Sequence, residues 1–288
     1  MRAIHTRREF LIATAAFGAA KTLATRSAFA DEAPPETTTI RLAKSSTICL
    51  APFYVAEELL RMEGFADIQY VDAPGGFAFP QLVASGRIDF ASTFAGSVVY
   101  HLDRGLPITV FGGLHVGCYE LFAHGPIHKV SDLKGRRVGI QTQASSGHLY
   151  VSIMAAHVGL DPNKDIDWVT GANSKELFAE GKIDAFLAFP PEPQELRARN
   201  IGHTIIKTTV DRPWSQYFCC MPFANRDFVK TYPIATKRVL RALVKAADFC
   251  AADPAGAAQR LRVPARVQME LLTAFLMIAA LLIILGAV

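Results

Sequence analysis

Two stretches of the chain, LVASGRIDFAST (Leu82–Thr93) and LFAEGKIDAFLA (Leu177–Ala188), follow one template. In each, a helical segment ends at a glycine, a basic residue, isoleucine and aspartate follow, and an apolar strand comes next. Gly86 and Gly181 suit the position just after a helix, where a positive φ is required. The pattern is short, so chance similarity is the alternative. As a genuine repeat it predicts two lobes built from the same helix–strand unit.

The surrounding chain alternates short apolar strands with helical segments. Such alternation predicts an α/β fold with largely parallel sheets that helices cover on both faces. The repeated unit recurs on each side of the middle of the chain, which favours two lobes over one long sheet. Strands are expected at Thr39–Ala43, Ile68–Asp72, Ile88–Ser92, Ile108–Gly112, Glu120–Ala123, Arg137–Ile140, Ile166–Val169 and Ala185–Ala188.

The first thirty residues have the features of an export signal. Arg7 and Arg8 precede an apolar stretch, Phe10–Ala20, and Ser27–Ala30 offers a cleavage site of small residues. The paired arginines match the twin-arginine type, and a general secretory signal with two chance arginines is the alternative. We therefore expect an exported, periplasmic protein.

The net charge of the whole chain is misleading about its partners. The formal charge is +4, but residues 1–30 contain five of the basic residues and one acid. Removal of that segment leaves 25 bases and 25 acids. Because no basic surplus remains, nucleic acid is not an expected partner.

The cysteines do not form a recognisable motif. The chain has five of them, none in a C-x-x-C pair, so neither a zinc site nor a thioredoxin-like redox site is predicted. An odd number gives no disulfide framework, and buried free thiols are the expected state. They are Cys49, Cys118, Cys219, Cys220 and Cys250.

No motif of a common enzyme class is present. The chain lacks G-x-S-x-G, H-E-x-x-H, G-x-G-x-x-G and P-loop patterns. His115, His124 and His128 lie close together in sequence, but the Gly125-Pro126 pair between the last two indicates a turn. We therefore expect no metal, no cofactor and no enzymatic activity.

A run of small, uncharged polar residues separates a strand from a helix in RRVGIQTQASSGHLY (Arg136–Tyr150). A helix N-terminus exposes unpaired N–H groups and a partial positive charge. Polar residues placed there either cap the helix or form a seat for a small polar ligand. Both possibilities remain open, and one serine can cap while its neighbour binds.

Several motifs, in order, resemble those of one protein family. They are GRIDFAST, DLKGRRVGIQ, SSGHLY, AAHVGLDPNKDIDW, GKIDAFLAFPPEP and VLRALVKAADFCAADP. The chain resembles the SsuA-like periplasmic solute-binding proteins of ABC transporters, of the nitrate, sulfonate, taurine and thiamine-pyrimidine-precursor type. The resemblance implies a two-lobed type 2 (Venus-flytrap) fold with hinge strands and a ligand in the cleft. It implies that a monomer captures a small polar or anionic organic solute and delivers it to the permease of an ABC importer.

The resemblance also implies a division of the chain and a set of ligand-binding residues. After the signal (1–30) we expect lobe 1 (31–123), lobe 2 (124–221), a return to lobe 1 (222–262) and an apolar tail (263–288). The expected ligand contacts lie on loops after the strands and at the helix start described above. They are Ser45, Ser46, Thr47, Thr93, Phe94, Ser97, His115, Gln143, Ser145, Ser146, His148, Phe189, Glu192 and Trp214.

Two alternatives share this fold. A binding protein of this type can present its ligand to a membrane receptor as a sensor. Related eukaryotic pyrimidine-synthesis enzymes also have the fold, but they carry a longer cysteine run than Cys219-Cys220. The sequence favours the binding protein because an export signal is expected.

The C-terminal segment departs from the family pattern. Leu271–Val288 has no charged residue, and a helix of that length spans roughly 27 Å, slightly less than a bilayer core. Arg260, Arg262 and Arg266 precede it, which disfavours a periplasmic location on that side. A membrane anchor, a core helix and a truncated or frame-altered gene product are the three alternatives.

Overall fold

The computed structural model describes residues 32–45, 47–73 and 76–261. The predicted export signal and the apolar tail (263–288) lie outside the described residues. Within the described ranges, no helix combines the length and the apolar character that crossing a bilayer requires.

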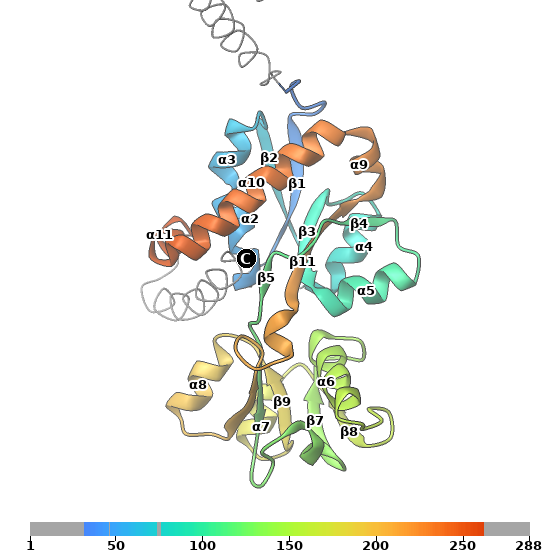
Figure 1. Cartoon of the computed structure of the whole chain (residues 1–288), viewed down its shortest axis with the longest axis vertical. Coiled ribbons are helices and arrows are strands. Elements are labelled where there is room, and N and C mark those ends of the chain that lie inside the picture. Colours follow the sequence, from blue (N-terminus) through green and yellow to red (C-terminus); the bar gives the residue numbers. More distant parts are fainter. Residues whose placement is uncertain (1–31, 46, 74–75, 262–288) are drawn as a thin grey trace, which may run out of the picture. The chain divides into compact units, whose positions relative to one another are not determined.

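The first sheet has six strands in the order β2-β1-β3-β11-β4, with β5 paired to β11 (Figure 1). Strands β1, β2 and β3 are parallel, and β11 runs antiparallel to β3, β4 and β5. The sheet is therefore mixed where the sequence predicted largely parallel pairing. Its strands are β1 (Thr39–Lys44), β2 (Asp67–Asp72), β3 (Phe90–Phe94), β4 (Ile108–Val110), β5 (His115–Val116) and β11 (Phe218–Asn225).

The second sheet has five strands in the order β10-β6-β9-β7-β8. Strand β7 is parallel to β8 and β9, whereas β6 is antiparallel to β9 and β10. The expected α/β class is confirmed by these two sheets and their helices. The strands are β6 (Glu120–Ala123), β7 (Arg136–Ile140), β8 (Ile166–Thr170), β9 (Ala185–Ala188) and β10 (His203–Lys207).

The helices bury the apolar faces of the two sheets. Helix α10 packs on α2 and α3 beside the first sheet (Figure 1). Around the first sheet lie α2 (Ala51–Val55), α3 (Glu57–Met62), α4 (Phe79–Ala84), α5 (Ala95–Asp103), α9 (Arg226–Thr231), α10 (Pro233–Ala252) and α11 (Pro254–Arg260). The second sheet is accompanied by α6 (Ser146–His157), α7 (Ser174–Ala179) and α8 (Glu192–Ala198). The described residues also form four short 3₁₀ helices: η2 (Ile48–Leu50), η3 (Gly76–Ala78), η4 (Val130–Leu133) and η5 (Trp214–Gln216).

The chain passes between the sheets twice, from β5 to β6 and from β10 to β11. The two crossing segments are bonded to each other. Thr208 N donates to Tyr119 O (3.0 Å), and Tyr119 N donates to Thr208 Oγ1 (3.0 Å). Strand β6 pairs in the second sheet, and β11 pairs in the first. The chain therefore crosses from one sheet to the other a few residues before the lobe boundaries expected at 123 and 221.

The repeated template has the same structure in both places. Gly86 and Gly181 adopt positive φ values of 72° and 69° after their helices. The Asp89 carboxylate accepts hydrogen bonds from Arg41 N (2.7 Å), Nε (3.1 Å) and Nη2 (2.6 Å) on strand β1. The Asp184 carboxylate accepts the equivalent three from Arg137 N (2.8 Å), Nε (3.1 Å) and Nη2 (2.7 Å) on β7. The aspartate of each copy therefore fixes the neighbouring parallel strand.

Candidate functional site

A pocket of about 440 Å³ is lined by residues from both sheets. Its lining comes from the carboxyl ends of β1, β2, β3, β7, β8 and β9 and the segments that follow them, together with Cys220 near the start of β11 and Tyr119 in a crossing segment. Ligands of open α/β sheets bind at that end of the strands. The volume lies in the range of small-molecule sites, about 300–1,000 Å³. This pocket is the candidate site.

The pocket contains half of the ligand contacts that the sequence predicted. Three come from the first-sheet side and four from the second. They are Thr47, Thr93, Phe94, Ser145, Ser146, Phe189 and Glu192.

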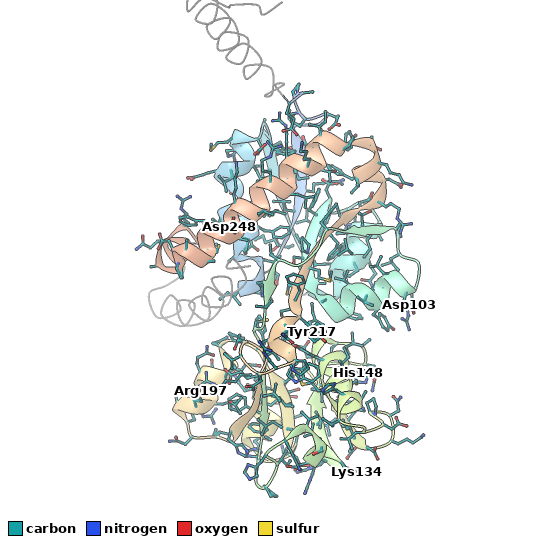
Figure 2. All side chains as sticks on the ribbon, in the orientation of Figure 1. Asp103, Lys134, His148, Arg197, Tyr217 and Asp248 are labelled. Carbon is teal, nitrogen blue, oxygen red and sulfur yellow. The ribbon has the colours of Figure 1, made fainter. Side chains whose placement is uncertain are left out.

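Other predicted contacts lie outside the lining because they serve in local structure. Trp214 is buried in the core and makes edge contacts with Tyr150 and His157. Figure 2 labels His148 on helix α6, where its Nδ1 accepts from Ala144 N at 3.1 Å. Gln143 is exposed beside them.

Three predicted contacts on the first-sheet side also lie outside the lining. Ser45 exchanges two hydrogen bonds with the Tyr54 hydroxyl, through its N–H (2.9 Å) and its carbonyl (2.8 Å). Ser97 and His115 are buried and do not line the pocket. Ser46 lies outside the described residues.

The two serines at the start of α6 differ in their position relative to the helix. Ser145 is buried, has extended backbone angles and accepts from His148 N at 3.5 Å, so it caps the helix. Ser146 is the first helical residue and lines the pocket. Ala144, just before the cap, has a φ of 61°, which turns the chain through a conformation that glycine adopts more readily.

Aromatic rings form a continuous wall of the pocket. Phe94 contacts Tyr119 and Tyr150, with ring centroids 5.9 Å and 5.2 Å apart, and Tyr119 contacts Phe189 at 5.2 Å. Sequence reasoning found Phe94 and Phe189 but missed Tyr119, because the crossing segment carries no motif. Phe77, Phe79 and Phe186 add further apolar lining.

The charge of the pocket is unusual for an anion site. Among the described residues that line it, none is lysine, arginine or histidine, and Glu192 is the one carboxylate. Glu192 Oε2 accepts from Phe189 N at 2.9 Å. Burial raises the pKa of Glu192 above its ordinary value of 4.5, and the bond from Phe189 offsets only part of that effect. The site therefore favours hydrogen-bond donors and positive charge over a full negative charge at this position.

The raised pKa of Glu192 predicts a pH effect on stability. A carboxyl group whose pKa is higher in the folded state stabilises the fold below its unfolded pKa, and that contribution is lost as pH rises through the folded pKa. Glu192→Gln keeps an oxygen for Phe189 N but cannot ionise. We expect its melting temperature to match that of the parent chain near pH 4 and to exceed it at neutral pH. Parallel melting curves across this pH range would contradict the shift.

Four cysteines from three separate segments gather beside the pocket, and two of them, Cys49 and Cys220, line it. Cys49, Cys118, Cys219 and Cys220 are buried and free. The Sγ atoms of Cys118 and Cys219 lie 2.6 Å apart, those of Cys49 and Cys118 3.8 Å, and those of Cys219 and Cys220 3.9 Å. Hydrogen bonds from the neighbouring thiols, Cys118 first, hold the pKa of Cys49 well below its ordinary value, whereas burial raises the pKa of Cys118 and Cys219. The sequence did not predict this cluster, because its members come from three segments with no shared motif.

Curated proteins with similar sequences include two fungal enzymes. The chain is 24% identical over 223 residues to the 4-amino-5-hydroxymethyl-2-methylpyrimidine phosphate synthase of Candida albicans (strain WO-1). It is 23% identical over 222 residues to the synthase THI13 of Saccharomyces cerevisiae (strain ATCC 204508 / S288c). The matches cover 71% and 70% of this chain, and the chain spans 65% of the length of each relative.

These names correct one expectation. The absence of enzyme motifs and the predicted export signal led to the expectation that the chain is not an enzyme. The curated relatives are named as synthases, so that expectation is wrong. Motif searches missed this because no common catalytic pattern marks the relationship.

Solved structures show the same fold. The alkanesulfonate-binding protein SsuA from Xanthomonas axonopodis pv. citri has a TM-score of 0.67 at 19% identity, with 84% of both chains covered. The periplasmic nitrate-binding protein NrtA from Synechocystis PCC 6803 has a TM-score of 0.66 at 18% identity, with 80% of this chain and 67% of that chain covered. The expected periplasmic-binding-protein fold is therefore confirmed.

The family model described as NMT1/THI5 like matches residues 49–257, which include the second sheet, the first sheet except β1, and the pocket lining except Thr47. The chain belongs to the NMT1/THI5-like family.

Proposed function

We propose that the chain binds a small polar organic solute in this pocket, and that an aminopyrimidine fits it better than a sulfonate or nitrate. The observation that carries the proposal is the composition of the lining. Aromatic rings offer stacking surfaces for a flat heterocycle. Glu192 offers an acceptor for an amino group, and Ser146 at the start of α6 offers a donor for a hydroxyl or phosphate oxygen.

An inorganic or sulfonate anion is supported less well by the same lining. Such ions are usually held by Arg or Lys in addition to a helix N-terminus. The described lining has no cationic side chain, and the Glu192 carboxylate repels an anion when it is ionised. An aminopyrimidine also agrees with the names of the fungal relatives, which are synthases of an aminopyrimidine phosphate.

We propose further that the protein works outside the cytoplasm and delivers its solute to an ABC importer. The paired Arg7 and Arg8 before an apolar stretch support export by the twin-arginine route. Replacing both with lysine preserves the charge but removes the pair. The double variant should therefore remain in the cytoplasm, whereas a Lys21→Arg control should be exported. Normal periplasmic accumulation of the double variant would contradict the proposed route.

A second candidate function is synthesis of an aminopyrimidine phosphate. Two observations favour it: the curated relatives are named for this product, and a cluster of buried thiols borders the pocket. The two functions differ in what happens to the bound compound. The protein is therefore incubated with a small-molecule cell extract, and the aminopyrimidine phosphate is quantified by mass spectrometry against a heat-denatured control. A binding protein should leave its amount unchanged, whereas a synthase should increase it.

A thermal-shift panel tests the choice of ligand class. The panel should contain 4-amino-5-hydroxymethyl-2-methylpyrimidine, its phosphate, taurine, an alkanesulfonate and nitrate. A ligand at a hundredfold excess over its Kd stabilises the folded state by about 2.7 kcal/mol. We expect stabilisation by the pyrimidines and little by the sulfonates or nitrate. The reverse order would contradict the aminopyrimidine proposal, and no stabilisation by any compound would count against a solute site.

Substitution of the two serines should separate capping from ligand binding. Ser145→Ala removes the cap and should lower the free energy of unfolding by about 0.5–2 kcal/mol, with little change in affinity. Ser146→Ala should leave stability nearly unchanged. It should weaken binding by about 1–3 kcal/mol, which is roughly five- to a hundredfold in Kd, because a ligand oxygen loses its donor. Urea unfolding measures the stability of each variant, and titration calorimetry measures its affinity for the ligand. If both variants bind as tightly as the parent, the ligand's polar group lies elsewhere.

A further inference from the structure

The charged side chains beside the pocket leave a surplus of negative charge around Glu192. This residue begins helix α8 and is the one carboxylate of the described lining. The charged groups that act on it are Lys175 and Glu176 on α7 and Glu195 on α8. Lys175 Nζ lies 2.7 Å from Glu195 Oε2 and 3.6 Å from Glu176 Oε1. Three carboxylates therefore share one ammonium group, and the local charge is negative whenever Glu192 is ionised.

Glu192 has one oxygen free for a ligand. Its Oε2 accepts from Phe189 N at 2.9 Å, which holds one side of the carboxylate. Its Oε1 has no hydrogen-bond partner among the described residues. Hydrogen bonds between two charged groups are roughly twice as strong as those between neutral groups. The free oxygen is therefore best satisfied by a nitrogen donor that carries a positive charge.

The aromatic part of the lining acts in the same direction. The face of an aromatic ring carries partial negative charge and attracts a cation, and the attraction is stronger where water is excluded. A flat heterocycle with a delocalised positive charge gains from stacking and from this attraction together. The aromatic residues of the lining are Phe77, Phe79, Phe94, Tyr119, Phe186 and Phe189.

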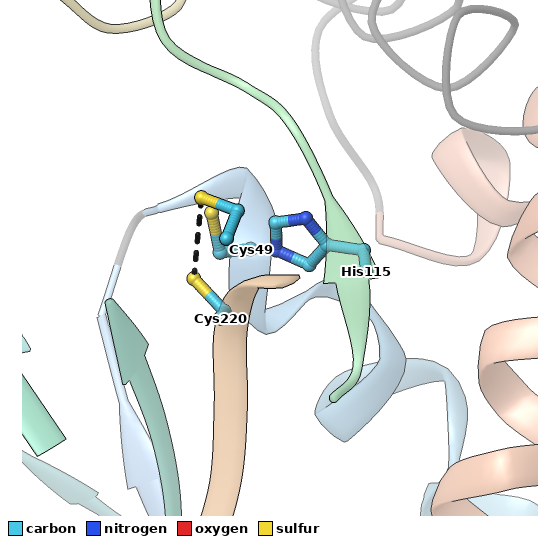
Figure 3. A group of neighbouring side chains, drawn as sticks. Cys49, His115 and Cys220 are labelled. Carbon is cyan, nitrogen blue, oxygen red and sulfur yellow. Dashed lines mark hydrogen bonds between the residues drawn. The ribbon is translucent and has the colours of Figure 1, made fainter. Parts of the chain in front are cut away.

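The other titratable groups of the lining do not reverse this charge preference. They are Cys49, Cys220 and Tyr119. Figure 3 shows Cys49 and Cys220 beside His115, whose ring nitrogen lies within 4.8 Å of both sulfurs. A proton that moves between Cys49 and His115 leaves their total charge unchanged. Burial raises the pKa of Tyr119 well above its ordinary value, so its hydroxyl stays neutral. Glu192 therefore sets the charge that the pocket prefers.

We propose that the pocket binds its solute as an organic cation, in which a ring nitrogen of the aminopyrimidine and Glu192 Oε1 share one proton. The inference rests on the proposed function, because it requires an aminopyrimidine in this pocket. Aminopyrimidines are weak bases, so the free compound is mostly neutral at neutral pH. On binding, the lone pair of a ring nitrogen takes up a proton from solvent, and the new N–H donates to the carboxylate. The complex therefore holds one proton more than the separated partners do once both are deprotonated.

Titration calorimetry of the full chain with 4-amino-5-hydroxymethyl-2-methylpyrimidine counts this proton. The titration is repeated at about pH 8 in buffers that differ in ionisation enthalpy, and the slope of the observed enthalpy against the ionisation enthalpy gives the number of protons taken up. We expect nearly one proton per solute in the parent. Its affinity should fall by about tenfold for each unit that the pH rises above the pKa values of the free partners, because one proton is linked to binding.

Glu192→Gln separates this proton from every other titration. The glutamine keeps an oxygen for Phe189 N but carries no charge. We expect it to take up no proton on binding, to lose the pH dependence, and to bind about ten- to a hundredfold more weakly than the parent at neutral pH. Glu195→Gln is the matched control, because it removes a carboxylate from the same helix that pairs with Lys175 and does not line the pocket. This control should keep both the proton uptake and the pH dependence.

The outcomes distinguish this inference from the proposed function. Binding by the parent without proton uptake would overturn the shared proton and leave the aminopyrimidine pocket standing. Proton uptake that persists in folded Glu192→Gln would also overturn it, because another group would then hold the proton. No binding of the aminopyrimidine at all would overturn both. The buffer dependence of the parent needs no variant, so the test remains decisive if Glu192→Gln does not fold.

Discussion

Replacing Phe90 with alanine is expected to lower the free energy of unfolding by about 3–5 kcal/mol. Phe90 lies fully buried on β3 in the centre of the first sheet. Its ring stacks on Phe111 and meets the edge of Phe228, each with centroids 5.7 Å apart. Alanine loses these contacts and leaves a cavity that a sheet between two helical layers cannot close.

Urea unfolding monitored by circular dichroism measures this loss. Met62→Ala is the control, because Met62 is 81% exposed and its truncation should change stability by less than about 0.5 kcal/mol. A Phe90→Ala variant that unfolds at the parent's urea concentration would show that β3 is not central to the core.

Asp89→Ala should lower the free energy of unfolding by about 2–3 kcal/mol, and Asp184→Ala should lower it by less. The two aspartates make the same hydrogen bonds, but Asp89 is more deeply buried. Each carboxylate accepts three hydrogen bonds from an arginine on the neighbouring strand. The Asp89 side chain is 4% exposed, against 25% for Asp184, so water replaces the lost bonds less well at Asp89. The arginines are partly exposed and can regain hydration, which keeps the cost below that of a fully buried ion pair.

The same urea experiment ranks the two variants, and each serves as the control for the other. The hydrogen bond from Arg137 lowers the pKa of Asp184. A lowered carboxyl pKa stabilises the fold above the unfolded pKa, and this contribution is lost as pH falls through the folded pKa. The difference between the parent and Asp184→Ala should therefore shrink in acid. A larger loss for Asp184→Ala than for Asp89→Ala would contradict the burial argument.

The fold could be predicted from the sequence where a local pattern has a local cause. The glycine and aspartate of the repeat each meet a requirement of their own turn, a positive φ and an acceptor for the next strand, so the two-sheet organisation was recognisable. The lobe boundaries were harder to place. The crossing segments between β5 and β6 and between β10 and β11 depend on pairing between Tyr119 and Thr208, which are far apart in the chain.

The candidate site was predictable only in part, for the same reason. Polar loops after strands and the start of α6 were visible as composition, and they include Ser146 and Glu192. Ser145 and Ser146 both line the pocket, and which of them caps α6 depends on one residue of helix register. The thiol cluster depends on strand pairing and on a register shift in β11, neither of which appears in the spacing of the cysteines. The enzymatic relationship was the disfavoured alternative, because an export signal was expected and the Cys219-Cys220 run is shorter than that of the related enzymes.

If the pocket between the two sheets holds the solute, a bulky side chain placed in it should abolish binding. Ser146→Trp places an indole in a pocket of about 440 Å³, at a helix position that accepts most side chains. The measurement is titration calorimetry of the parent and this variant with 4-amino-5-hydroxymethyl-2-methylpyrimidine. We predict one binding site in the parent and a loss of more than about a hundredfold in Kd, or nearly 3 kcal/mol, in the folded variant. Equal binding by the two proteins would contradict the account.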